Sequence, residues 1–242
     1  MAVCFVLTDA GLWFWIIGLL LYLSSLALGS FAIGLNFYLQ NINKLPSNQN
    51  QIAVTFDDGP TPLTLDVLKI LAKWNARATF FCIGSAIETY PEILVKIHEE
   101  GHLIGNHTYS HKNWFPVLRI DDMISDVNKT TDLIQNLIHQ RPILFRPPFG
   151  VTNPRIAKAV KNLGLKSIGW NKRSLDTVSK NNSAILKRVT KNLTSGDIIL
   201  FHDNLPQAAE NLDLFLAVAT EKGFKCERLD NILNINAYEP AI

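Results

Sequence analysis

Cysteine is scarce in this chain of 242 residues, and none of its 3 cysteines has a close partner in the sequence. Cys4 lies near the N-terminus, whereas Cys82 and Cys226 fall in apolar runs that predict strands. The absence of a CxxC pair and of a dense cysteine pattern argues against a disulfide framework. We therefore expect buried free thiols, which say little about the compartment of the protein.

An excess of charge of one sign is also missing. The 23 Lys and Arg residues nearly balance the 21 Asp and Glu residues, which gives a formal net charge of +2. Because no basic run appears along the chain, the composition provides no surface for nucleic acid. Past its apolar start, the chain is long enough for one sizeable domain, and we expect no nucleic-acid partner.

Charged residues are lacking between positions 11 and 39, where Leu, Ile, Trp, Phe and Tyr dominate. A membrane-spanning helix needs roughly 20 apolar residues, so the stretch is long enough for one tilted helix. No basic region and no A-x-A site precede it, which disfavours a cleaved signal peptide. The aromatic residues near its ends are typical of interface anchors: Trp13, Trp15, Phe37 and Tyr38. We predict a membrane segment at 1–39, a polar linker at 40–51 and a catalytic-type domain at 52–242.

Seven apolar runs follow position 51, and helical patterns separate most of them. The runs predict strands at 52–56, 78–83, 103–105, 143–146, 167–170, 198–202 and 224–226. The helical patterns lie at 64–74, 90–100, 120–140, 153–163, 183–193 and 208–222. Alternation of this kind requires parallel strands, and seven units favour a closed or nearly closed barrel. We predict an α/β fold, a distorted (β/α)7 barrel preceded by an N-terminal transmembrane helix.

Two adjacent carboxylates, Asp57 and Asp58, lie where the first predicted strand ends in Gly59-Pro60. At this turn both side chains can lean over one site, where two like charges repel each other. A cation between them, or a different role for each, relieves the repulsion. The alternative interpretation is an ordinary turn, since Asp-Gly and Gly-Pro are common in loops.

A histidine pair, His107 and His111, follows the third predicted strand. Its spacing of four residues brings both rings to one side of a helical turn, as in other zinc-binding pairs. One Asp and two His provide three protein ligands and leave a position for water, which is typical of catalytic zinc. Taken by itself, an HxxxH pair is a weak signal.

Two further strand ends carry candidate residues. Arg146 opens the segment Arg-Pro-Pro-Phe-Gly, whose prolines stiffen the loop. The stiff loop can hold the guanidinium against a carboxylate and point the Phe149 N–H at one position. His202 ends the apolar strand at 198–202. A surface salt bridge for Arg146 and a capping role for His202 are the alternatives. Since all four pieces follow strands, they share the rim where barrel enzymes have their chemistry.

The segments TFDDGP, HTYSH, RPPFG and LFH, in this order, resemble the polysaccharide deacetylase family, which is carbohydrate esterase family 4 or the NodB-homology domain. The resemblance extends from about residue 52 to about residue 229. It implies a divalent metal, foremost Zn²⁺ with Co²⁺ or a similar ion as alternatives. The ligands that the resemblance implies are Asp58, His107 and His111.

The resemblance implies the remaining roles as well. Asp57 would be the general base, Arg146 would keep Asp57 ionised and oriented, and His202 would be the general acid. The developing oxyanion would lie between the metal and the Phe149 N–H. Trp170 would help to line the pocket for the acetyl methyl group.

One motif departs from the family pattern, in which a Trp is followed by an Asp and then by Asp-Trp. Here Arg173 replaces the earlier acid and Thr177 replaces the closing Trp. Asp176 remains, and a pair with His202 would raise the pKa of the imidazole, which suits an acid. Arg173 would either pair with an acid that the sequence does not identify or bind an anionic part of the substrate.

The resemblance implies an N-deacetylase that acts on an acetylated glycan containing N-acetylglucosamine, such as peptidoglycan or a chitin-like chain. It favours a domain on the outer side of the cytoplasmic membrane, although Lys44 beside the apolar segment would by itself favour the cytoplasm. Two alternatives stay open. One is an O-deacetylase of the acetylxylan type, or a hydrolase of small amides or lipid-linked sugars. The other is a non-catalytic barrel that binds glycan or metal.

Overall fold

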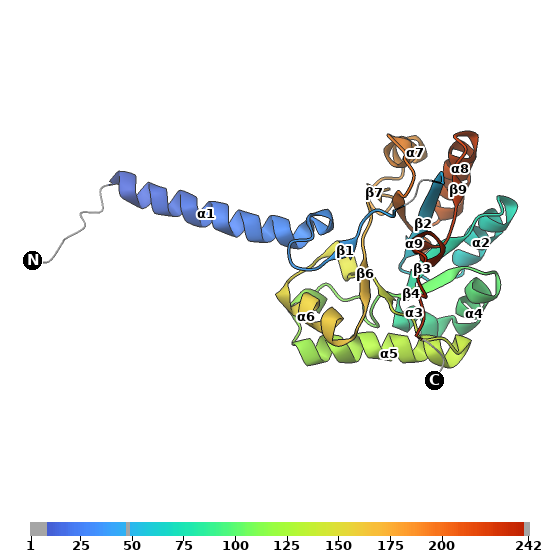
Figure 1. Ribbon diagram of the computed structural model, residues 1–242, viewed down its shortest axis with the longest axis horizontal. Coiled ribbons are helices and arrows are strands. Elements are labelled where there is room, and N and C mark those ends of the chain that lie inside the picture. Colours follow the sequence, from blue (N-terminus) through green and yellow to red (C-terminus); the bar gives the residue numbers. More distant parts are fainter. Residues whose placement is uncertain (1–8, 47–48, 240–242) are drawn as a thin grey trace, which may run out of the picture.

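The computed structural model describes residues 9–46 and 49–239, and Figure 1 shows a long helix that projects from a mixed body of helices and strands. The helices are α1 (Asp9–Phe31), α2 (Thr64–Lys73), α3 (Gly84–Thr89), α4 (Pro91–Glu99), α5 (Ile120–Ile138), α6 (Pro154–Asn162), α7 (Asn182–Thr190), α8 (Ala208–Glu221) and α9 (Leu229–Leu233). The strands are β1 (Asn41–Ile42), β2 (Gln51–Asp57), β3 (Ala78–Cys82), β4 (Leu103–Asn106), β5 (Leu144–Phe145), β6 (Lys166–Ile168), β7 (Lys172–Arg173), β8 (Ile198–His202) and β9 (Lys225–Cys226).

All strand pairs among these named strands are parallel, in the order β1-β6-β5-β4-β3-β2-β8-β7, with β9 paired to β2. The strands β6 and β7 are consecutive in the chain but lie on opposite sides of this order. Residues 169–171 therefore cross from one edge of the sheet to the other, which curls it into an open barrel. The predicted α/β barrel is confirmed as a parallel-strand barrel of this open kind.

Each of the seven predicted strands is present, because uniformly apolar runs suit strands that are covered on both faces. In the central strand β2 every residue after Gln51 is buried. Two short strands, β1 and β7, were not predicted. Both are edge strands of only two residues, which is too short for a hydrophobic pattern that sequence could reveal.

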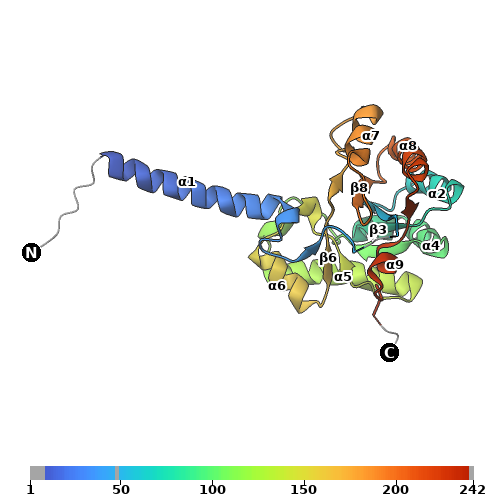
Figure 2. The same cartoon turned by 45° about the horizontal axis from the view of Figure 1, so that its top comes forward.

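The six predicted helices are also present, and they pack around the sheet (Figures 1 and 2). Their apolar faces follow from the 3.6-residue period: α5, for example, buries Met123, Val127, Ile134 and Ile138. The short helices α3 and α9 were missed, since six and five residues are too few for a periodic pattern.

Aromatic side chains form the centre of the core. Phe56 of β2 stacks on Phe80 with ring centroids 4.9 Å apart and faces Phe201 at 6.2 Å. Phe201 in turn meets Phe215 of α8 at 5.7 Å. These three strand residues, Phe56, Phe80 and Phe201, belong to the adjacent strands β2, β3 and β8. Their ring contacts stabilise the packing of these strands near their C-terminal ends.

Helix α1 stands apart from the barrel, and its side chains from Leu12 onward are almost all exposed (Figure 2). The stretch Leu12–Phe31 is long and apolar enough to cross a membrane, so it is a candidate span. The helix itself ends at Phe31, so residues 32–39 of the predicted segment lie beyond it. The chain then turns back, and the Phe37 ring lies so close to Gly29 that a Cβ there would be 2.7 Å from it.

The predicted linker at 40–51 contributes to the barrel. Asn41 and Ile42 pair with β6, and Leu45 is buried with its N–H bonded to the Gly196 carbonyl at 2.7 Å. The polar composition of the stretch conceals this because several contacts are hydrogen bonds to distant residues: the Asn41 side chain, for example, accepts from Ser167 Oγ at 2.6 Å. Residues 1–8, 47–48 and 240–242 of the three predicted segments lie outside the described residues, and the domain boundaries stay a prediction.

The expectation for the cysteines holds for two of the three. Cys82 and Cys226 are buried free thiols. Burial raises the pKa of Cys226 to about 12, so its thiolate is not formed near neutrality. Cys4 lies outside the described residues.

Candidate active site

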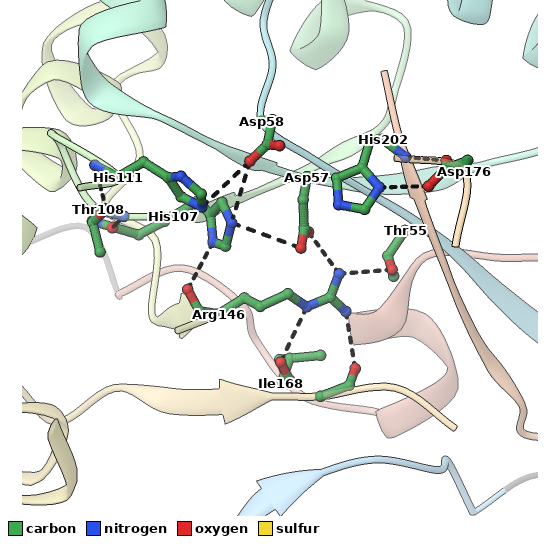
Figure 3. Close-up of polar contacts among 12 residues, drawn as sticks. Thr55, Asp57, Asp58, His107, Thr108, His111, Arg146, Ile168, Asp176 and His202 are labelled. Carbon is green, nitrogen blue, oxygen red and sulfur yellow. Dashed lines mark hydrogen bonds and ion pairs between the residues drawn. The ribbon is translucent and has the colours of Figure 1, made fainter. Parts of the chain in front are cut away.

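The four sequence segments meet at one rim of the barrel, as the strand order requires (Figure 3). Asp57 and His202 are register partners on the adjacent strands β2 and β8. Asn106 and Phe145 are register partners on β4 and β5, so His107 and Arg146, one residue later, also lie side by side. Residues up to 145 positions apart in the chain therefore face a common space.

Asp58, His107 and His111 form a cluster whose ligand atoms all lie within 4.8 Å of one another. Asp58 Oδ1 is 3.6 Å from His107 Nε2 and 3.4 Å from His111 Nε2. The same Oδ1 atom is buried and accepts no hydrogen bond from the described residues. A buried carboxylate oxygen without a partner, facing two imidazole nitrogens, fits a divalent cation with mixed nitrogen and oxygen ligands.

The orientation of the His107 ring supports this fit. Its Nδ1 lies 2.8 Å from the Arg146 carbonyl oxygen. Because a carbonyl oxygen can only accept a hydrogen bond, Nδ1 carries the proton and donates it in this bond. The Nε2 lone pair is thus directed at Asp58 and His111. Backbone carbonyls hold metal-binding imidazoles in the same way.

His111 is kept neutral by its surroundings. Burial, followed by the neighbouring His107, lowers the pKa of His111 to about 4, although Asp58 acts in the opposite direction. A pKa below the ordinary 6.5 means that the ring is uncharged near neutral pH. A neutral imidazole has the free lone pair that a metal ligand needs.

Asp57 is fixed by a fully buried arginine. Arg146 donates from one terminal nitrogen to Asp57 Oδ1 at 2.7 Å and to Thr55 Oγ1 at 2.9 Å. Its other nitrogens donate to the carbonyls of Ile168 and Gly169 at 3.1 and 2.9 Å. Burial alone would raise the pKa of Asp57, but the charge and hydrogen bond of Arg146, together with the charges of His107 and His202, hold that pKa below its usual value. Asp57 is therefore ionised near neutrality.

His202 is paired with Asp176, as the sequence suggested. Its Nδ1 lies 2.8 Å from Asp176 Oδ1, and its backbone N–H donates to Oδ2 at 2.9 Å. Burial opposes the charged ring, yet the hydrogen bond and the charge of Asp176 raise the pKa of His202 above its ordinary 6.5. Its free Nε2 faces the same side as Asp57 (Figure 3).

A cavity of about 180 Å³ lies among these groups. Its wall includes every candidate site residue except Arg146 and Asp176, which lie behind Asp57 and His202. Trp170 and Leu200 supply apolar surface. Gly150 passes beneath the Trp170 ring at a distance that leaves no room for a side chain.

The Phe149 backbone has the rare left-handed conformation, with φ 60°, and its ring stacks beside His111 at 4.6 Å between centroids. Gly150 and Val151 bond back to the loop, whereas no described residue accepts the Phe149 N–H. Asp58, Thr108 and His111 also have positive φ, at 76°, 67° and 43°. Strained non-glycine backbone gathered at one cavity is typical of functional sites.

Arg173 is exposed, and its guanidinium lies 5.7 Å from the centre of the Trp170 ring. It lines the cavity, but no described acid forms an ion pair with it. Of the two options left open for Arg173, the structure therefore does not support a structural acid partner.

Sequence reasoning missed several supporting residues. Thr55 accepts from Arg146, and Asn106 holds the histidine segment by accepting from the Thr108 N–H at 2.8 Å and donating to helix α5. Leu200 was not singled out within its apolar strand. Thr55 is the first residue of TFDDGP and Asn106 directly precedes HTYSH, and these positions were the available signal.

Asp203 is another buried acid that was overlooked. It lies against Gly59 and accepts from Thr64 Oγ1 at 2.6 Å. Burial raises the pKa of Asp203 to about 7, with the Thr64 hydrogen bond acting against the rise. Its place behind the Asp57 turn makes it a support of the loop.

Comparison with known proteins shows to which family the chain belongs. A family model described as polysaccharide deacetylase matches residues 44–168, slightly more than half of the chain. The chain belongs to the polysaccharide deacetylase family.

Several relatives of this deacetylase-family chain are named as peptidoglycan deacetylases. It is 34% identical over 179 residues to peptidoglycan-N-acetylmuramic acid deacetylase PdaC of Bacillus subtilis, covering 74% of this chain and 38% of the relative. It is 35% identical over 164 residues to a peptidoglycan-N-acetylglucosamine deacetylase of Bacillus cereus, covering 66% of this chain and 76% of the relative. The chain thus spans well under half the length of PdaC.

The fold agrees with that relationship. The crystal structure of the Bc1960 peptidoglycan N-acetylglucosamine deacetylase superposes with a TM-score of 0.77 at 29% identity. The superposition covers 81% of this chain and 94% of that chain. Most of the fold of this chain is therefore shared with a solved deacetylase.

We predict that Arg146→Met lowers the free energy of unfolding by about 3–5 kcal/mol, because it leaves the Asp57 carboxylate buried and unpaired. The native Asp57 has a lowered pKa, so the pair stabilises the fold above the ordinary pKa of 3.8 and loses its effect as pH falls through the folded value. Urea unfolding at neutral and acid pH measures both effects.

The control is Arg119→Met, which removes an arginine from an exposed pair with Asp122 and should change stability little. Adding Asp57→Asn to Arg146→Met should restore part of the loss. An Arg146→Met protein as stable as its Arg119→Met counterpart would show that the buried pair is not structural.

Proposed function

We propose that this protein is a metal-dependent deacetylase that hydrolyses N-acetyl groups of a glycan containing N-acetylglucosamine, with peptidoglycan as the polymer class. One observation carries this proposal: three kinds of group meet at a single cavity. They are a cluster of metal-ligand type, the Asp57 carboxylate bonded to Arg146, and the His202 imidazole bonded to Asp176. Amide hydrolysis needs these three parts, since it requires an activated water, charge stabilisation and a proton for the leaving amine.

Asp58, His107 and His111 are the proposed ligands of a divalent metal. Nitrogen and carboxylate donors suit Zn²⁺ first, and Co²⁺ or a related ion would accept the same set. When bound, the ion supplies Lewis-acid polarisation of the amide and a lower pKa for its water.

Asp57 is the proposed general base. Arg146 occupies Oδ1, which leaves Oδ2 to face the His107 side of the cavity at 3.7 Å from Nε2. The carboxylate is ionised at neutral pH, so it can take a proton from water during attack on the acetyl carbonyl.

His202 is the proposed general acid. Asp176 occupies Nδ1 and stabilises the imidazolium, so the proton at Nε2 is available to the amine nitrogen as its bond to the acetyl carbon breaks. The products are then acetate and a free amine on the sugar. Asp176 acts through His202 and is a positioning residue.

The rest of the cavity would bind the acetyl group. The free Phe149 N–H can donate to the oxygen that becomes negative during attack. Trp170 and Leu200 offer an apolar surface for the methyl group. The geometry favours an amide over an O-acetyl ester, because an alcohol is a better leaving group than an amine and depends less on an acid such as His202.

We place the catalytic domain at the cell envelope, on the outer side of the cytoplasmic membrane, with α1 as its anchor. Support comes from the apolar candidate span Leu12–Phe31 and from relatives named for peptidoglycan, a polymer outside that membrane. Hydrogen bonds from Thr152 to the Ser30 and Gly29 carbonyls, at 2.9 and 3.3 Å, hold the barrel against the end of the helix.

We expect His107→Ala to lower metal affinity by roughly a hundredfold or more and to abolish turnover, because only two protein ligands remain. Metal content after dialysis, together with acetate release, measures the outcome. His139→Asn is the matched control, since His139 is an exposed histidine with positive φ that Asn tolerates. Full metal retention by His107→Ala would refute the ligand assignment.

Asp57→Asn tests the reaction itself. Acetate release from N-acetylated and O-acetylated oligosaccharides should be measured for the natural protein and this variant. The natural protein should prefer the N-acetyl substrate, and the variant should keep its metal while losing turnover by about 10²–10⁴-fold. Near-normal turnover in the variant removes Asp57 from the base role, and a preference for O-acetyl groups supports the esterase alternative.

Asp176→Asn should change the pH dependence of kcat/KM. The raised pKa of His202 keeps the acid protonated as pH rises, so activity is lost only above that pKa. Without the carboxylate the pKa of His202 falls, and the alkaline limb moves to lower pH, with a loss of roughly 10- to 100-fold at neutral pH. The acid limb, set by Asp57, should stay in place; an unmoved alkaline limb would contradict the assignment of His202.

A further inference from the structure

The positive charge of this protein is concentrated in one part of the chain. Residues 133–196 contain 12 Lys or Arg residues and a single acid, Asp176, although the whole chain has a formal net charge of only +2. Asp176 is buried against His202 and offers no compensation at the surface. Outside this stretch the chain has 20 Asp or Glu residues and 11 Lys or Arg residues, so the basic side chains are concentrated in one part of the sequence.

Part of this charge lines a groove beside the catalytic cavity. The groove, called here the α7 groove, has a volume of about 630 Å³ and is lined by Asn171, Lys172, Arg173, Ala184, Lys187, Arg188, Lys191 and Asn192. Five of the eight lining residues are basic and none is acidic. Arg173 also lines the catalytic cavity, so the two hollows adjoin at that residue.

The fold holds these cations together. Helix α7 turns Ile185 and Val189 into the core, which leaves Lys187 and Arg188 exposed on its outer side. The N-terminus of α7 is capped by Asn181, whose side chain accepts from the Ala184 N–H at 3.0 Å. Figure 1 shows α7 beside β7, the strand that carries Lys172 and Arg173.

Only one of the five cations is neutralised. Lys172 donates to the carbonyls of Lys191 and Asn192 at 2.6 and 2.9 Å and lies 3.6 Å from the Asp197 carboxylate. Within the described part of the chain, no ion pair joins a carboxylate to the other four, which are Arg173, Lys187, Arg188 and Lys191. Like charges gathered around a hollow favour an anion there.

We propose that the α7 groove binds carboxylate groups of the glycan strand whose acetyl group occupies the catalytic cavity. This inference rests on the proposed function. A peptidoglycan strand carries lactyl and peptide carboxylates next to its acetylated sugars, whereas a chitin-like strand is uncharged. Arg173 lies 5.7 Å from the centre of the Trp170 ring and lines both hollows, so a strand that extends from the catalytic cavity into the groove would pass it. The groove therefore selects the anionic polymer over the neutral one.

The test compares two substrates on the full-length chain. The variant Lys187→Gln/Arg188→Gln/Lys191→Gln removes three groove charges and leaves Arg173 and the catalytic cavity intact. The control Lys158→Gln/Lys161→Gln/Lys166→Gln removes three exposed charges from α6 and β6. Acetate release is measured on a peptidoglycan oligosaccharide with free carboxylates, on its methyl ester and on a chitin tetramer.

The groove variant should lose about tenfold in kcat/KM on the free-carboxylate substrate, from three exposed ion pairs of modest strength. It should act normally on the methyl ester and the chitin tetramer, and the α6 control should act normally on all three. Added salt should reduce the preference of the natural protein for the free carboxylates. An equal loss on charged and neutral substrates, or an equal loss in the control, overturns the proposal.

Failure of the proposed function gives a different result from failure of the groove proposal. If the natural protein releases no acetate from any substrate, binding of the same fluorescently labelled oligosaccharides still tests the groove. Tighter binding of the free-carboxylate form, lost in the groove variant alone, supports the groove without the reaction. Binding that ignores the carboxylates overturns it, as does groove-dependent binding only to vesicles of anionic phospholipid.

Discussion

The buried guanidinium of Arg146 is the interaction on which the site depends. It crosses the barrel interior from β5 and joins the central strand β2, through Thr55 and Asp57, to the far edge of the sheet at Ile168 and Gly169. Its flat faces lie near Phe81 and Trp170, at 4.1 and 5.5 Å from the ring centres. A lysine could not serve in this way, because the interaction needs several donors in one plane. The same residue thus links strands across the barrel interior and helps to keep the proposed base ionised.

Backbone geometry orders the other groups around this centre. The Arg146 carbonyl accepts from His107, so the loop that supplies the guanidinium also sets the direction of a proposed metal ligand. On the other side, the register of β2 with β8 puts His202 beside Asp57. The Asp176 carboxylate is hydrogen-bonded to both the ring and the backbone N–H of His202. Few of these side chains can change position independently, which is the preorganisation that electrostatic catalysis requires.

The segment from Trp170 to Thr177 departs from the family pattern. Arg173 takes a position where the family pattern has an acid, and the change adds a cation at the mouth of the cavity without disturbing the Asp176–His202 pair. The α7 groove extends that positive surface away from the reaction centre. The residues proposed for the reaction thus differ from those proposed to select the polymer, and Arg173 lies between the two sets.

The sequence by itself determined the parallel strands, most of the helices and the chemical types gathered at the rim. A strand that is buried on both faces is uniformly apolar, so its sequence reveals it. Parallel topology puts the C-terminal ends of all strands on one side, so the motifs in 55–58 and 107–111 are expected at one rim from sequence alone. Only the tertiary structure decided that 40–46 belongs to the sheet, that α1 ends at Phe31, and that Thr55 and Leu200 serve the site. Those contacts depend on register and on packing between residues distant in the chain, which local patterns of hydrophobicity do not encode.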